Sequence, residues 1–148
     1  MQGRSGNKLI ATIDKEKFYC IDTTYIGKIL NLQNLNLNYF LALINSKLIN
    51  YWYGIQFKTS TISGYELDQI PIKRIDNKNK NVYENIVKKV SLILDLNKRL
   101  IEIQDKQTDS KAQLEKEIQK LDNEIDEEVY KLYGITEEEK KIIEDSLK

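Results

Sequence analysis

A coiled-coil seam runs through the last third of the sequence. Apolar residues recur there at the alternating four- and three-residue spacing that places all of them on one side of an α-helix. A helix from about Ser110, where S-x-x-Q forms a capping box, to Tyr133 presents this stripe and must bury it against another element. The stripe consists of Leu114, Ile118, Leu121, Ile125 and Leu132.

The segment just upstream has the same helical periodicity. Between residues 82 and 103 apolar positions follow helical spacing, beginning with Ile86 and Val90. Because only the short loop DKQTD separates the two stretches, we expect an antiparallel helical hairpin with both stripes in its seam. Gly134 ends the second helix, and Thr136 with Glu139 forms a capping box that starts a short C-terminal helix.

The first half of the chain has shorter periods. A β-hairpin is indicated by KLIATI and FYCI, which flank the polar DKEK. A third candidate strand is TTYIGKIL. We expect QIPIKRI to be an edge strand, because Pro71 cannot donate a hydrogen bond to a central strand ladder. Residues 39–52 predict one helix that ends before Gly54. We therefore predict an α+β fold: a small β-sheet with one packed helix, a long antiparallel helical hairpin and a short C-terminal helix. The Asn-rich IDNKNKN divides the chain into subdomains 1–76 and 77–148.

A net charge of zero conceals an uneven distribution along the chain. Residues 1–74 carry nine Lys/Arg against five Asp/Glu, or +4, whereas residues 75–148 carry 14 against 18, or −4. A basic first half is compatible with a polyanionic partner such as DNA, although a solvated surface has the same composition.

Few residues are suited to catalysis. Histidine is absent, which removes the usual general base and the commonest zinc ligand. Cys20 is the only cysteine, which is compatible with a cytoplasmic protein, and the apolar run around it is typical of a buried residue. No phosphate-binding glycine loop and no membrane-spanning run occurs. The pairs Asp14/Glu16 and Glu66/Asp68, like the stretch EIDEEVY, are interpreted as solvated charges. We expect no catalytic residue, metal or cofactor in this chain.

One polar segment suits nucleic-acid contacts. FKTSTISGYEL clusters hydroxyl donors and a cation around a glycine, groups that match phosphate oxygens and base edges, although a plain turn has a similar composition. GRSGNK near the N-terminus is a phosphate-contacting loop or a frayed end. The aromatic residues 39 and 51–53 could stack on bases, but their helical spacing favours core packing, for Phe40 and Trp52 above all. The candidate DNA-binding residues are Lys58, Thr59, Ser60, Thr61, Tyr65, Arg4 and Lys8.

The order of four segments resembles a known family. KLIATIDKEKFYCIDTTYIGKI, YFLALINSKLINYWYG, FKTSTISGYELDQIPIKRI and EEVYKLYGITEEEKKIIE follow one another as in the TaqI-like C-terminal specificity domain of restriction-modification DNA methyltransferases, over about residues 4–144. The most telling features are Asn45 and Ser46 in INSKLIN, the polar loop before ELDQIPI, and the closing VYKLYGITEEE. The chain is also similar to type I specificity subunits.

This resemblance implies sequence-specific recognition of double-stranded DNA within a bacterial restriction-modification system. The parent enzyme would be an S-adenosylmethionine-dependent adenine-N6 methyltransferase, with an endonuclease attached in some forms. The motif N-P-P-Y/F and the nuclease signature P-D…D/E-x-K are absent here, so we expect this chain neither to methylate nor to cut. The resemblance also implies that the chain starts within the family domain. Residues 58–61 would lie near base edges or phosphates, with Arg4, Lys8 and Tyr65 as supporting contacts.

The hairpin has two open interpretations. In the resemblance it is a spacer or docking arm toward a methyltransferase domain or subunit, as the paired long helices of type I specificity subunits are. The alternative is a structural coiled-coil module, in which residues 82–133 mediate homodimerisation or subunit docking without any role in DNA reading.

Overall fold

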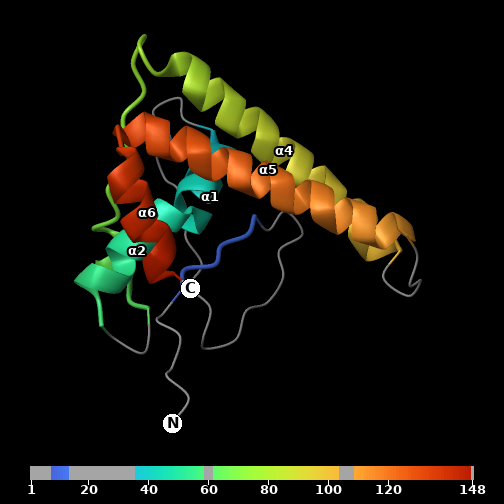
Figure 1. Cartoon of the computed structure of the whole chain (residues 1–148), viewed down its shortest axis with the longest axis horizontal. Coiled ribbons are helices and arrows are strands. Elements are labelled where there is room, and N and C mark those ends of the chain that lie inside the picture. Colours follow the sequence, from blue (N-terminus) through green and yellow to red (C-terminus); the bar gives the residue numbers. More distant parts are fainter. Residues whose placement is uncertain (1–7, 14–35, 59–61, 104–108, 148) are drawn as a thin grey trace.

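The computed structural model describes residues 8–13, 36–58, 62–103 and 109–147 (Figure 1). Within these ranges the secondary structure is helical, and no strand occurs. The helices are α1 (Leu37–Asn45), α2 (Lys47–Gln56), α3 (Gly64–Leu67), α4 (Lys80–Glu102), α5 (Asp109–Tyr133) and α6 (Glu137–Ser146).

The predicted α+β fold with a β-sheet is therefore wrong for the described part of the chain. Residues 8–13 and 69–75 were both expected to be strands, but their backbone groups find side-chain partners instead of a ladder. The backbone N–H groups of Leu9 and Ala11 donate to asparagine side chains, and that of Lys73 donates to the Tyr133 phenol. The strands expected at residues 18–21 and 23–30 lie outside the described residues.

The single helix expected over residues 39–52 is two helices. Ser46 adopts an extended backbone, with φ −66° and ψ 150°, and it ends α1 while capping α2. Its hydroxyl accepts a hydrogen bond from the Ile49 backbone N–H at 3.3 Å and donates one to the Leu43 carbonyl at 2.7 Å. The predicted helix end at Gly54 is also wrong, because α2 continues through this glycine to Gln56.

The predicted helical hairpin is confirmed. Helices α4 and α5 lie side by side and antiparallel, and they extend well beyond the other helices (Figure 1). In the seam Ile86, Val90 and Ile125 are buried near the body of the fold, whereas Leu114, Ile118 and Leu121, toward the distal end, are half-buried. The start of α5 at Asp109 places Ser110 inside the helix rather than at its N-cap.

Both expected boundaries around residue 134 are confirmed. Gly134 has a φ of +72°, a conformation that favours glycine, and Ile135 N–H donates to the Tyr130 carbonyl at 3.0 Å in the pattern of a Schellman motif. Thr136 and Glu139 then form the capping box that starts α6.

One hydrophobic cluster unites the segments before and after residue 76. Helix α1 packs on α4, α2 packs on α5, and α6 packs on α2. None of the described helices is both long and apolar enough to cross a membrane. The buried cluster consists of Leu9, Tyr39, Ala42, Leu43, Ile49, Tyr53, Ile86, Val90, Ile125, Val129 and Leu132.

Candidate nucleic-acid interface

The N-terminal segment is held on the helices by two asparagine side chains. Asn50 Oδ1 accepts from the Leu9 backbone N–H at 2.7 Å, and Asn45 exchanges two hydrogen bonds with the Ala11 backbone, at 2.8 and 3.0 Å. Asn50 Nδ2 also donates to the carbonyls of Ile44 and Ser46, so both polar atoms of this buried side chain have hydrogen-bond partners. Residues 45, 46 and 50 of the INSKLIN segment are therefore structural, and they leave Lys8 exposed beside α2.

The other end of α2 anchors the polar segment that contains most of the candidates. The phenol of Tyr53 donates to Glu66 Oε2 at 2.6 Å, and the same carboxylate oxygen accepts from the Ser63 backbone N–H at 3.0 Å. The Ser63 hydroxyl in turn caps α3 by accepting from Glu66 N–H. The interpretation of Glu66 as a solvated charge is wrong, because only 5% of this residue is exposed.

The aromatic residues of α1 and α2 contribute mainly to packing. Tyr39 and Tyr53 are fully buried, which removes them from the candidates for base stacking. Trp52 and Tyr53 both contact the ring of Phe57, at centroid distances of 5.8 and 5.1 Å. Trp52 is partly buried against the hydrophobic cluster, as its predicted core role requires. Through its ring contacts, Phe57 anchors the backbone just before the polar segment.

Three of the predicted DNA-binding residues can be placed. All three are exposed, namely Lys8, Lys58 and Tyr65, the last by 75%. Each is next in sequence to a residue that contacts α2: Leu9, Phe57 and Glu66 respectively. Helix α2 is thus the common support of these three side chains. Arg4, Thr59, Ser60 and Thr61 lie outside the described residues.

An ion pair between a half-exposed lysine and a buried aspartate, which sequence patterns did not indicate, joins α2 to the hairpin. Asp126 Oδ1 accepts from the Lys47 backbone N–H at 2.9 Å, and Lys47 Nζ lies 3.2 Å from Asp126 Oδ2 and 3.6 Å from Glu144 of α6. Only 5% of Asp126 is exposed, so its inclusion among the solvated charges of EIDEEVY is wrong. The available signal was its position next to the seam residue Ile125.

Burial and charge act in opposite directions in this pair. Burial raises the pKa of Asp126, and the hydrogen bonds and positive charge of Lys47 only partly reverse that rise. Partial burial lowers the pKa of Lys47, but attraction and hydrogen bonds from Asp126 and Glu144 outweigh it, and the pKa is raised. Lys47 thus fixes α2 to α5 through Asp126 and to α6 through Glu144.

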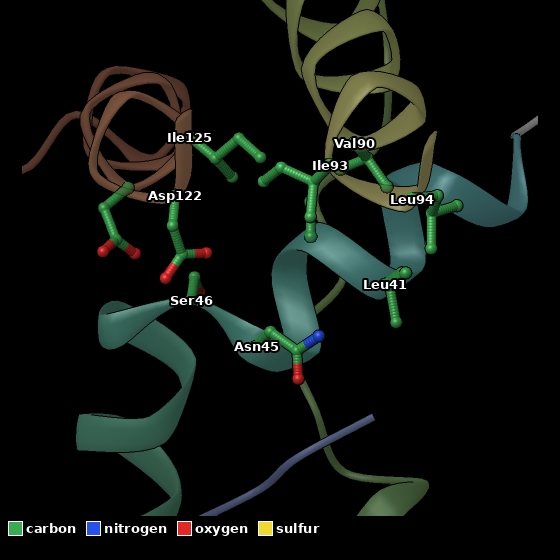
Figure 2. Close-up of a pocket in the computed structure, with 10 residues that line it drawn as sticks. Leu41, Asn45, Ser46, Val90, Ile93, Leu94, Asp122 and Ile125 are labelled. Carbon is green, nitrogen blue, oxygen red and sulfur yellow. The ribbon is translucent and has the colours of Figure 1, made fainter. Parts of the chain in front are cut away.

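A small cavity lies beside this pair, between α1, α4 and α5 (Figure 2). Its volume is about 60 Å³, far below the roughly 300 to 1,000 Å³ of small-molecule pockets. Leu41, Val90, Ile93, Leu94 and Ile125 line its apolar side, and Asn45, Ser46, Asp122 and Asp126 its polar side. Its size suits a few water molecules.

Comparison with known proteins bears on the first half of the chain. Residues 1–72 match the family model of the TaqI-like C-terminal specificity domain. The matched region includes α1 to α3 and ends before α4. It is therefore shorter than the resemblance suggested, which extended to about residue 144. Searches among curated proteins and among solved structures give no match. Residues 1–72 of this chain are therefore similar to the TaqI-like C-terminal specificity domain.

Proposed function

We propose that this chain is the DNA target-recognition part of a bacterial restriction-modification adenine methyltransferase. The observation that carries the proposal is the match of residues 1–72 to a specificity domain. In this proposal residues 1–72 face double-stranded DNA, and the α4/α5 hairpin holds them against a methyltransferase domain or subunit. Methyl transfer from S-adenosylmethionine, and cleavage where an endonuclease is attached, belong to the rest of the parent enzyme.

The anchoring of the polar loop supports this role. Phe57 and Glu66 lie on either side of the polar segment 58–63, and the ring and the hydroxyl of Tyr53 contact these two residues respectively. A loop whose ends are fixed to one buried side chain presents its polar groups at lower entropic cost than a free loop. Hydroxyl groups at residues 59–61 would read base edges, while Lys58 would contact a phosphate.

Binding to duplex DNA at several salt concentrations tests the proposal. We expect the fluorescence anisotropy of a labelled duplex to report binding that weakens steeply between about 50 and 200 mM salt, because phosphate contacts release counterions. Selection from a randomised duplex pool should enrich one sequence with the wild-type chain. The triple change Thr59→Ala, Ser60→Ala and Thr61→Ala should lose that enrichment. An absence of salt-dependent binding, or unchanged enrichment by the triple variant, contradicts the proposal.

The second candidate function is a homodimerisation or subunit-docking module. It is favoured by two exposed apolar residues on α4, Leu92 and Ile101, which are 45% and 66% exposed. Light scattering should then show a dimer that Ile101→Lys dissociates, while Ile142 on α6, which is 58% exposed, serves as the control site for the same change. A monomeric wild-type chain contradicts self-association.

A further inference from the structure

The segment that leads from α3 into the first residue of α4 is rich in exposed cations. We call residues 73–80 the basic connector; it contains Lys73, Arg74, Lys78 and Lys80 against one acid, Asp76. All four cationic side chains are exposed. Of these four cations, only Lys80 has an ion-pair partner among the described residues, Glu84 at 3.8 Å on the surface. Lys73, Arg74 and Lys78 thus have no counter-charge among the residues that the structure describes.

The backbone of the basic connector is held rigidly at its start. The Tyr39 phenol donates to the Lys73 carbonyl at 2.8 Å. The Tyr133 phenol accepts from Lys73 N–H at 3.1 Å and donates to the Pro71 carbonyl at 2.6 Å. Two helices that belong to different parts of the sequence, α1 and α5, therefore fix successive peptide groups on either side of Lys73.

The acidic residue within the basic connector is used by the backbone. Asp76 Oδ1 accepts from the N–H groups of Lys78 and Asn79, at 2.8 and 3.1 Å. Asn79 completes the turn by accepting from Asp76 N–H at 2.8 Å and donating to the Arg74 carbonyl at 3.0 Å. These hydrogen bonds fix the backbone of the turn, and thereby the positions from which the cationic side chains extend.

The position of the basic connector relates it to the DNA-facing half. It follows α3, which carries Tyr65, and in Figure 1 it rises along one side of the fold, away from α2, to the start of α4. It lies just beyond residue 72, where the family match ends.

We propose that the basic connector is a second contact with double-stranded DNA, one that binds backbone phosphates and reads no bases. The inference rests on the proposed DNA recognition and extends its surface beyond the family domain. Exposed, unpaired Lys and Arg on a rigid backbone suit phosphates, because such contacts need charge and position rather than a base-specific donor pattern. Contacts of this kind fix the register of the protein on the duplex.

A pair of matched double variants tests this contact. Arg74→Gln with Lys78→Gln removes two charges from the basic connector, and Lys98→Gln with Arg99→Gln removes the same two residue types near the distal end of α4, where both are exposed. The connector variant should flatten the plot of log affinity against log salt by about 1.8, near 0.9 for each phosphate contact. It should weaken binding by the same factor on two duplexes of unrelated sequence.

The control variant should keep the wild-type slope, and the charge-conserving Arg74→Lys with Lys78→Arg should restore it. Thermal unfolding of every variant is compared with wild type, since the exchanged side chains are exposed and the fold should be retained. An unchanged slope in the connector variant, with normal salt-dependent binding by wild type, overturns this inference and leaves DNA recognition standing. An equal loss in the distal control overturns it as well, because net charge alone would then explain the effect. If the wild-type chain does not bind DNA at all, both proposals fall.

Discussion

The phenol of Tyr53 donates a 2.6 Å hydrogen bond to the carboxylate of Glu66, joining α2 to the one-turn helix α3. Both groups are buried, and the carboxylate also accepts from Ser63 N–H within the capping box. A helix of four residues has little stability of its own, since forming a first helical turn is unfavourable. The polar loop thus depends on this pair for the position of its second end.

Tyr53→Phe is expected to lower the free energy of unfolding by about 1.5 to 3 kcal/mol, because the buried carboxylate loses a charge-assisted hydrogen bond. Urea denaturation followed by circular dichroism measures the loss. Tyr65→Phe removes the same hydroxyl from a residue that is 75% exposed and should leave the unfolding midpoint unchanged. Equal midpoints for Tyr53→Phe and wild type would contradict the anchoring role.

Asn50→Ala should release the N-terminal segment from α2. The change removes the acceptor of the Leu9 N–H and the two donations to the carbonyls of Ile44 and Ser46, all within a buried site. We expect a destabilisation of about 1 to 3 kcal/mol and faster hydrogen exchange at the Leu9 amide. Asn81→Ala, at an exposed position in the first turn of α4, is the control. Unchanged exchange at Leu9 would show that Asn50 does not hold the segment.

Two buried tyrosines should respond in opposite ways to loss of the hydroxyl. Tyr39 donates to the Lys73 carbonyl, so Tyr39→Phe should cost about 0.5 to 1.5 kcal/mol. The Tyr130 hydroxyl is buried and has no hydrogen-bond partner among the described residues, so Tyr130→Phe should be neutral or stabilising. Thermal or urea unfolding of the two variants decides the matter. A larger loss at Tyr130 than at Tyr39 would refute the assignment of partners.

The C-terminal half of this fold was predictable because its signals are local. The seam spacing, Gly134 and the Thr136–Glu139 capping box each act within a few residues of sequence. The extended segments could not be assigned correctly, because Leu9, Ala11 and Lys73 find their partners on Asn50, Asn45 and Tyr133, 34 to 60 positions away. No periodicity encodes such partners.

The candidate site shows the same division. Lys8, Lys58 and Tyr65 are exposed as their polar surroundings indicated. Composition gave no sign that Glu66 and Asp126 are buried. Their hydrogen-bond donors, on Tyr53 and Lys47, are far away in the sequence, so the residues around each carboxylate look the same as those around a solvated one. For residues 59–61 the prediction stays a prediction.

Alkaline pH should destabilise the fold through its buried tyrosines. Burial raises the pKa of Tyr39, and neighbouring Tyr133 and Tyr83 raise it further; burial also raises the pKa of Tyr133. Above the ordinary tyrosine pKa of about 10, the unfolded chain loses protons that the folded chain keeps, so the free energy of unfolding falls as pH rises, by up to about 1.4 kcal/mol per pH unit for each such group.

Urea unfolding midpoints measured between about pH 8 and pH 11 test this direction, with tyrosinate absorbance followed in parallel. The stabilising contribution is fully present below about pH 10 and is lost as pH rises toward the folded-state pKa. Tyr39→Phe should show a shallower alkaline decline than wild type, even though it starts from a lower stability. Lys47, whose pKa is also raised, contributes in the same direction, so some decline should remain in the variant. An alkaline decline as steep in Tyr39→Phe as in wild type would place its origin in groups other than the Tyr39 phenol.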